Sequence, residues 1–291
     1  MRRLRGLSIM LFAWFVPAAM LLVRPAYGEP AAPPLAVTYP RAHDADDKRS
    51  EYYVKLIDLA LAKSGVKYDL RASSGELPPM LAIDAIKNHA GIDIIWGPTS
   101  AEVETLLLPI RIPIDKGILG WRLILIKERD RAKFAGVKTL AQLRTFTAGL
   151  AHTWTDNKIL RANGLPVVEG GSYDELFGML AADRFQYFPR GVGEIWNEQQ
   201  THAGLGLEVE PHLALHYPRI SYFFVANGNR RLAQAIEQGL RAAMQDGSFD
   251  KLFWQYNGPA IERAHLRNRI VFDLDNPLPP AVKPLLTDPG F

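Results

Sequence analysis

Aromatic and hydroxyl side chains stand at the ends of predicted strands in the first third of this chain. Tyr39 ends one apolar run, while Trp96, Thr99 and Ser100 end or follow another, Ile92–Trp96. Hydroxyl and backbone N–H groups donate hydrogen bonds to anions, above all where a helix begins. We therefore predict that these four residues contribute to a site for a small polar ligand. Two of them have a structural alternative, since Ser100 can be a helix cap and Trp96 a core residue.

Four further candidates lie in the second half of the chain. Trp154, Thr155 and Asp156 come between a predicted strand and a predicted helix, and Arg190 follows the predicted strand Phe185–Phe188. A guanidinium group offers carboxylate or phosphate a fixed fork of donors. We predict that these residues complete the ligand site. The structural alternatives are a helix cap for Thr155 and an exposed surface position for Arg190.

Several kinds of chemistry are excluded or unsupported. The chain has no cysteine, which excludes a thiolate nucleophile, a cysteine metal site and a disulfide. It also lacks the nucleophile elbow, the dinucleotide fingerprint and the phosphate-cradling loop. His212 and His216 are four residues apart, but prolines bracket them and no acidic residue lies between them. We therefore predict neither a metal nor a cofactor.

The elements that must position these residues alternate between strand and helix. In the first part, apolar runs predict strands at Leu35–Tyr39, Tyr68–Ala72 and Ile92–Trp96. Apolar residues spaced three and four apart predict helices from Ser50, closed at Gly65, and over Pro79–Asn88. This order, βαβαβ, is typical of a parallel sheet covered by helices.

A second alternating set follows, and then a helix pair. The predicted strands are Gly117–Lys127, Phe146–Leu150, Val167–Val168, Phe185–Phe188 and Ile220–Val225. The predicted helices are Thr155–Asn163, Tyr173–Ala182, Val192–Thr201, Arg230–Gln245 and a last one that Ser248 can cap.

We predict an α/β protein with two α/β lobes joined by a two-strand hinge. One lobe comprises residues 29–118 plus 222–291, and the other comprises residues 119–221. The strands near 117–127 and 220–225 are the expected crossings. Ligands of α/β proteins bind beyond the carboxyl ends of the strands, so the cleft is expected where the eight candidate residues lie.

The first 28 residues predict an export signal. Three arginines precede the uncharged, mostly apolar run 7–23, and Ala26-Tyr27-Gly28 offers small residues for a signal peptidase. We expect cleavage and a periplasmic protein. The alternative is a retained membrane tether, since 17 residues are the lower limit for a spanning helix.

Removal of that segment changes the charge of the chain. The whole sequence has 34 basic and 31 acidic residues, and the four arginines of residues 1–28 account for its excess positive charge. The remainder has 30 basic and 31 acidic residues, a net charge of −1. This balance disfavours a nucleic-acid partner, because such binding depends on clustered positive charge.

From about Leu35 to Tyr256 the sequence resembles type II periplasmic solute-binding proteins, in particular the polar amino-acid class. The resemblance rests on the order and spacing of "IDIIWGPTS", "VKTLAQL" and "NRRLAQAIEQGLRAAMQDGSFDKLFWQY". It implies two lobes, a two-strand hinge, a small polar ligand trapped by closure and delivery to an ABC permease of the inner membrane.

The chain departs from that class at two positions. Members usually carry an arginine shortly after the first-lobe hydroxyl residue, where this chain has Ala101-Glu102-Val103-Glu104. They also carry an aspartate after the second-lobe strand, where this chain has Pro189-Arg190. We therefore predict an anionic or weakly basic solute, held partly by Arg190.

The resemblance leaves two other functions open. Some proteins of this fold are dehydratases, for which Glu194 and Asp156 would be the acid–base candidates. For Glu194 we prefer the structural explanation, a favourable acid in the first turn of a helix. The other function is a sensor subunit for a membrane receptor. We expect a monomeric, non-catalytic binding protein.

Overall fold

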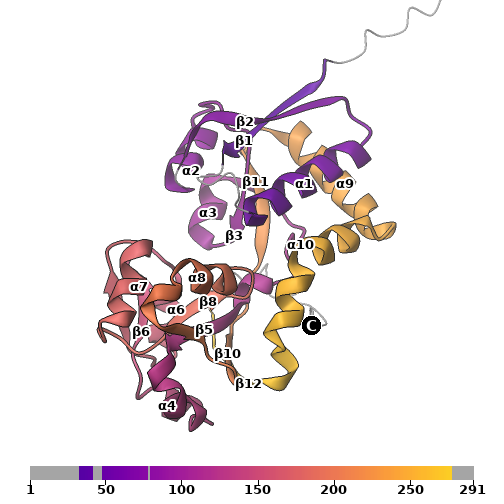
Figure 1. Cartoon of the computed structure of the whole chain (residues 1–291). Coiled ribbons are helices and arrows are strands. Elements are labelled where there is room, and N and C mark those ends of the chain that lie inside the picture. Colours follow the sequence, from indigo (N-terminus) through magenta and orange to yellow (C-terminus); the bar gives the residue numbers. More distant parts are fainter. Residues whose placement is uncertain (1–32, 42–47, 78, 277–291) are drawn as a thin grey trace, which may run out of the picture. The chain divides into compact units, whose positions relative to one another are not determined.

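The predicted rhythm of strands and helices is present in the computed structural model, which describes residues 33–41, 48–77 and 79–276. We call the part that contains the β1–β2 pair and the β3-β11-β4 sheet the first lobe (Figure 1). Its elements are β1 (Leu35–Arg41), α1 (Lys48–Lys63), β2 (Tyr68–Glu76), α2 (Pro79–Lys87), β3 (Ile94–Pro98), α3 (Ala101–Leu106), β4 (Leu108–Ile110), β11 (Ser221–Val225), α9 (Arg230–Gln245) and α10 (Ser248–Ala264).

The first lobe has the predicted βαβαβ order. Strands β1 and β2 are parallel, and β3 and β4 both pair antiparallel with β11. The backbone N–H of Asp93 donates to the carbonyl of Thr38 at 2.9 Å and so ties the start of β3 to β1. These pairings place the carboxyl end of β3, with Trp96 and Pro98, at the edge where a ligand is expected.

Helices α1, α9 and α10 pack against one another in this lobe (Figure 1). Helix α9 has the predicted bounds, and its buried residues Leu232, Ile236 and Leu240 repeat every four positions on one face. Gly65 lies in the turn directly after α1 and has a positive φ of 74°, as predicted for a left-handed cap. Helix α10 differs from the prediction, because Gly247 and not Ser248 is its N-cap residue.

The second lobe contains the remaining elements. They are β5 (Trp121–Lys127), α4 (Arg131–Ala135), α5 (Leu140–Leu143), β6 (Ala148–Ala151), α6 (Asp156–Ala162), β7 (Val167–Gly170), α7 (Tyr173–Ala181), β8 (Phe188–Gly191), α8 (Ile195–Thr201), β9 (Leu207–Val209), β10 (Leu213–His216) and β12 (Ile270–Asp273). The strand order of the main sheet is β12-β10-β5-β8, with β9 also paired to β5, while β6 and β7 form a parallel pair.

Strand β8 lies three residues later than predicted. The strand was predicted to end at Phe188, but Pro189 pairs with Ile124 of β5. Proline is tolerated here because β8 ends this strand order and the residue need not donate to a further neighbour. Arg190 is consequently inside the strand and not in the loop after it.

Strand β12 was not predicted and changes the expected lobe boundary. It follows α10 of the first lobe, yet it pairs in parallel with β10 of the second lobe. Residues 270–273 therefore belong with the second sheet and not with the predicted segment 222–291. The chain passes between the lobes a third time, in addition to the two predicted crossings. With β12 assigned to the second lobe, we propose the predicted division into two lobes for the rest of the chain.

The two predicted crossings lie next to each other. Ile114 N–H donates to the carbonyl of Ser221 at 3.1 Å, and Tyr217 N–H donates to that of Gly120 at 3.1 Å. A Cβ atom at Gly120 would lie 2.2 Å from the Tyr217 carbonyl oxygen, so only glycine permits this approach. We call residues 114–120 and 217–221 the crossing segments.

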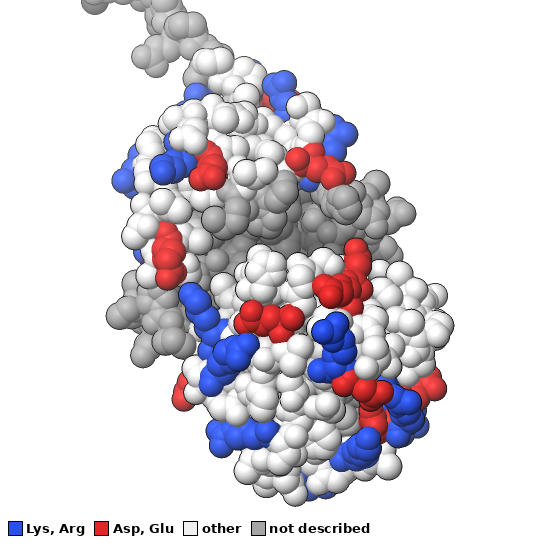
Figure 2. Space-filling view, turned by 90° about the vertical axis from the view of Figure 1, so that its left-hand side faces the viewer, with Lys and Arg blue, Asp and Glu red and all other residues white. Residues whose placement is uncertain are grey.

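Within the described residues, no helix combines the length and the apolar character that a bilayer span requires. The predicted signal segment, residues 1–28, lies outside the described residues. On the face shown in Figure 2, acidic and basic side chains are interspersed and form no single-sign field.

Candidate functional site

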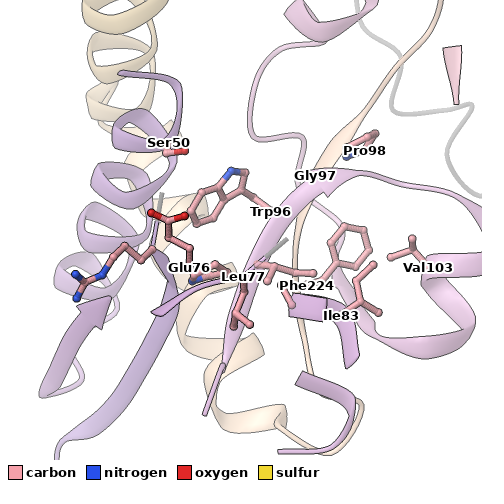
Figure 3. Close-up of a pocket in the computed structure, with 13 residues that line it drawn as sticks. Ser50, Glu76, Leu77, Ile83, Trp96, Gly97, Pro98, Val103 and Phe224 are labelled. Atoms are coloured by element: carbon pink, nitrogen blue, oxygen red, sulfur yellow. The ribbon is translucent and has the colours of Figure 1, made fainter. Parts of the chain in front are cut away.

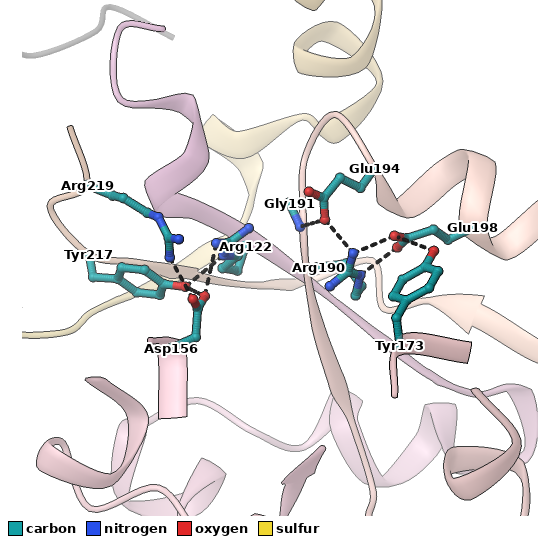
Figure 4. A network of polar contacts seen from close by, with 9 residues as sticks. All are labelled: Arg122, Asp156, Tyr173, Arg190, Gly191, Glu194, Glu198, Tyr217 and Arg219. Carbon is teal, nitrogen blue, oxygen red and sulfur yellow. Dashed lines mark hydrogen bonds and ion pairs between the residues drawn. The ribbon is translucent and has the colours of Figure 1, made fainter. Parts of the chain in front are cut away.

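All four predicted second-lobe site residues line a polar cavity of about 500 Å³. It is lined by Pro98, Arg122, Thr153, Trp154, Thr155, Asp156, Tyr173, Pro189, Arg190, Glu194 and Arg219. Two groups of ion-paired side chains, one around Asp156 and one around Arg190, make up its charged wall (Figure 4).

We call Arg122, Asp156, Tyr217 and Arg219 the Asp156 cluster. Oδ1 of Asp156 accepts from Nη2 of Arg122 at 2.9 Å and from the Tyr217 hydroxyl, and Oδ2 accepts from Nη1 of Arg219 at 2.6 Å. Nε of Arg122 donates to the Tyr217 hydroxyl at 2.7 Å. The cluster joins β5, the start of α6 and one crossing segment.

These contacts fix the protonation of Asp156. Burial raises the pKa of this carboxyl, but the guanidinium groups of Arg122 and Arg219 and the Tyr217 hydroxyl outweigh it. They hold the pKa of Asp156 well below its usual range. Burial and the neighbouring Asp156 carboxylate raise the pKa of Tyr217 to about 12, against the opposing effect of Arg122. Asp156 is thus a permanent anion.

We call Tyr173, Arg190, Glu194 and Glu198 the Arg190 cluster. Nε and Nη2 of Arg190 donate to the two carboxylate oxygens of Glu198 at 2.7 and 2.5 Å. Nη2 also lies 2.6 Å from Oε2 of Glu194, and the Tyr173 hydroxyl donates to Glu198 at 2.9 Å. The fork of Arg190 is therefore already filled by a carboxylate of its own lobe.

Aromatic rings surround this guanidinium group. Its carbon lies 4.8 Å from the ring centre of Trp154, 5.3 Å from that of Tyr173 and 4.9 Å from that of Phe188. Cation–π attraction adds to the ion pairs and holds the group in place. Arg190 is consequently a rigid part of the cavity wall.

The two clusters carry opposite formal charge. Two arginines face one aspartate in the Asp156 cluster, whereas one arginine faces two glutamates in the Arg190 cluster. The first cluster is thus +1 and the second −1. They meet at Gly191, where a Cβ atom would lie 3.0 Å from Nη1 of Arg122 and 3.2 Å from the carboxyl carbon of Glu194.

The structure brings four of the eight predicted residues together in the polar cavity, namely Trp154, Thr155, Asp156 and Arg190. Thr155 is the N-cap residue of α6 but makes no capping hydrogen bond with its side chain. Glu194 lines the same cavity. It is the N-cap residue of α8, which begins at Ile195 and not at Val192 as predicted.

The first-lobe candidates are placed differently. Trp96 lines two neighbouring cavities and stacks on Tyr53, with ring centres 5.5 Å apart. Tyr39 lies within β1, packed on the hydrophobic core. The Thr99 hydroxyl donates to Glu104 at 2.5 Å, and Ser100 caps α3 by accepting from the N–H of Val103 at 3.3 Å. The last three residues are absent from the walls of the cavities described here, and their predicted binding role stays a prediction.

Four residues of the two clusters were not predicted as site residues, namely Arg122, Glu198, Tyr217 and Arg219. Arg122 carried a usable signal, because a charge inside the apolar strand Trp121–Lys127 requires a buried partner. Glu198 lies eight residues after Arg190 and carried only the weak signal of an acid on α8. Tyr217 and Arg219 lie between β10 and β11, and no local pattern links them to Asp156.

The two histidines considered as metal ligands have other surroundings. Nδ1 of His216 lies 2.7 Å from Asp273 of β12, and His212 is exposed. Among the described residues, no group of three or more histidine, aspartate or glutamate side chains is arranged to hold a metal ion.

No family model and no curated protein matches the sequence. Solved structures do match the fold. An ancestral arginine-binding protein bound to arginine has 16% identity and a TM-score of 0.53, with 76% of this chain and 97% of that chain covered.

Two other solved structures have TM-scores close to this value. The arginine-, lysine-, histidine-binding protein of Geobacillus stearothermophilus has 12% identity and a TM-score of 0.51, with 78% of this chain and 96% of that chain covered. A histidine kinase sensor domain with similarity to periplasmic binding proteins has 14% identity and a TM-score of 0.52, with 77% and 96% covered. The predicted fold is thus confirmed: this chain has the α/β fold of periplasmic binding proteins.

Proposed function

We propose that this chain is a non-catalytic solute-binding protein that holds a small zwitterion in its polar cavity. The observation that carries the proposal is the pair of oppositely charged clusters in one cavity wall. A solute with a carboxylate and an ammonium group matches both clusters at once, whereas a simple anion or cation matches one and is repelled by the other.

The carboxylate of the solute is assigned to the Asp156 cluster. In the part of the chain that the structure describes, Nη1 of Arg122 and Nη2 of Arg219 have no hydrogen-bond partner. Both arginines line the cavity and are held by Asp156, so their donors are oriented before the solute arrives. This assignment replaces the predicted grip by Arg190, whose fork binds Glu198.

The ammonium group is assigned to Glu194. Its carboxylate lines the polar cavity and belongs to the cluster with excess negative charge. Its Oε2 contacts Nη2 of Arg190 and accepts from the N–H of Gly191 at 3.3 Å, and a carboxylate offers about four acceptor positions in all. Glu194 thereby takes the role that the resemblance gives to an aspartate.

The compared structures support binding as the function, since two of them are amino-acid-binding proteins and one is a sensor domain. We propose a periplasmic location and delivery of the solute to an ABC permease. A sensor subunit is the second candidate, favoured by the similarity to the kinase sensor domain. Co-purification of a permease or of a sensor kinase with the tagged chain distinguishes the two.

The dehydratase alternative is weakened by the state of Asp156. A general acid or base works best with a pKa near the working pH, and the arginines hold the pKa of Asp156 far below it. Purified protein should therefore bind zwitterions without turning them over.

The test compares three ligand types by isothermal titration calorimetry. Native mass spectrometry of the freshly purified protein from Glu29 onward identifies any co-purified solute. The protein is then unfolded and refolded to remove that solute. We expect a zwitterionic amino acid to bind at least tenfold more tightly than its deaminated acid or its decarboxylated amine. Each lost charge partner should cost about 1.5–3 kcal/mol.

Glu194→Gln is the matched variant. It should weaken binding of the zwitterion at least tenfold and leave binding of the deaminated acid unchanged or stronger. If the acid binds wild-type protein as tightly as the zwitterion does, the solute is an anion and the proposal is wrong.

A further inference from the structure

A second cavity, of about 530 Å³, lies between α2, α3 and the β3–β11 pair (Figure 3). Its wall is mainly apolar, with Ile83 from α2, Val103 from α3, and Ile95 and Phe224 from the sheet. We call it the apolar cavity. Its charged lining residues, Arg41 and Glu76, lie at the ends of β1 and β2.

The volume of this cavity is in the range of ligand sites, which occupy roughly 300–1,000 Å³. Ala82, Ile95 and Phe224 are buried and belong to one hydrophobic cluster, so the wall is a stable apolar surface. The apolar cavity therefore has the dimensions and lining of a binding site.

The apolar cavity adjoins the polar one. Pro98 lines both, and it also lines a third cavity of about 390 Å³ that includes Trp96, Gly97 and Glu194. Glu194 in turn belongs to the polar cavity. The carboxyl end of β3 is thus the common wall, and Trp96 is fixed there by its stacking on Tyr53.

We infer that the solute carries a large apolar side chain, which occupies the apolar cavity while its charged head occupies the polar cavity. The inference rests on the proposed function, since the head-group contacts are those assigned above. A branched or aromatic side chain fits the lining, and its removal from water provides affinity that the polar contacts lack. A small side chain would leave the cavity unfilled, and a charged side chain would face an apolar wall.

The experiment measures the dissociation constants of alanine, leucine, phenylalanine and tryptophan by calorimetry on refolded protein. All four share one zwitterionic head and differ in the apolar side chain. Burial of a methylene group strengthens binding about fourfold. We expect leucine, phenylalanine and tryptophan to bind at least tenfold more tightly than alanine.

Val103→Trp is the variant that fills the apolar cavity, and Thr105→Trp is its control on the exposed side of the same helix. The first should weaken binding of leucine and phenylalanine at least tenfold and leave alanine unchanged. The second should change neither. Ile83→Trp fills the cavity from α2 and provides an independent variant if Val103→Trp does not fold, as checked by thermal unfolding.

The possible failures are distinguishable. If alanine binds as tightly as leucine, or if filling the cavity affects both equally, the side-chain inference is wrong while the proposed function stands. If none of the four binds while another zwitterion does, the inference alone is wrong. If no zwitterion binds, the proposed function fails together with the inference.

Discussion

Asp156 is the common ion-pair partner of two arginines that line the polar cavity. It pairs with Arg122 and Arg219 and is itself buried. Removal of one partner of a buried ion pair leaves the other charges without compensation. Loss of the Asp156 carboxylate is therefore expected to destabilise the second lobe as well as to change the cavity.

We predict that Asp156→Ala lowers the free energy of unfolding by about 3–5 kcal/mol. Urea denaturation followed by tryptophan fluorescence measures the change. The control is Glu169→Ala, which breaks a salt bridge of 3.0 Å between two exposed side chains and should cost less than about 1 kcal/mol. Equal effects of the two variants would contradict the buried-pair explanation.

The pH dependence of the same contact has a defined sign. The pKa of Asp156 is lower in the folded chain than in the unfolded one, so its contribution is present above the ordinary aspartate pKa and is lost as the pH falls toward the folded value. The stability difference between wild type and Asp156→Asn should therefore shrink on acidification.

At the residue scale, the sequence indicated which residues line the site better than it indicated their ion-pair partners. Trp154, Thr155, Asp156 and Arg190 were located because they flank predicted strands. The partners Arg219 and Glu198 depend on how separate segments meet, and one-dimensional spacing does not contain that information. An arginine read as a ligand grip proved to be paired within its own lobe.

At the scale of elements, helices α1 and α9 approach each other closely at Gly239. A Cβ atom at Gly239 of α9 would lie 1.7 Å from the carbonyl oxygen of Ala60 in α1. Backbone atoms cannot move aside as a flexible side chain can, so a larger residue must separate the helices.

We predict that Gly239→Ala destabilises the protein by about 3 kcal/mol or more. Gly178→Ala in α7 is the matched control, because no atom lies within 4 Å of the added Cβ. It should stabilise the protein by about 0.5–1 kcal/mol through the better helix propensity of alanine. Thermal unfolding measures both, and a neutral Gly239→Ala would disprove the close approach.

Element prediction was most accurate where the periodicity was long, and the strands that it missed are all short. The sixteen residues of α9 define an amphipathic face without help from neighbours. Strands β4, β9, β10 and β12 have only three or four residues each. Such runs become strands because a partner strand is present, and the partner is set by the fold.

At the scale of the whole molecule, the crossing segments contain a buried acid. Asp115 is nearly inaccessible, and its Oδ1 accepts from the N–H of Gly117 at 3.0 Å. Burial raises the pKa of this carboxyl above its usual range, although Ser221, the Gly117 N–H and Arg219 oppose the effect. The charge of Asp115 thus destabilises the crossing segments that join the two lobes.

We predict that Asp115→Asn stabilises the protein at neutral pH by on the order of 1 kcal/mol, because an amide keeps the contact with Gly117 without a buried charge. The folded pKa is raised, so wild-type stability falls as the pH rises through the interval above the ordinary aspartate value. The advantage of the variant should vanish near pH 4. Thermal unfolding across this range measures it, and an advantage independent of pH would contradict the explanation.

The return of the chain into β12 has a practical consequence for measuring lobe motion. The first described strand, β1, belongs to the first lobe, whereas the last, β12, belongs to the second. Fluorophores attached near the two ends of the described chain therefore mark different lobes. Energy transfer between them would vary with lobe separation, which makes this topology a natural scaffold for a reporter of solute concentration.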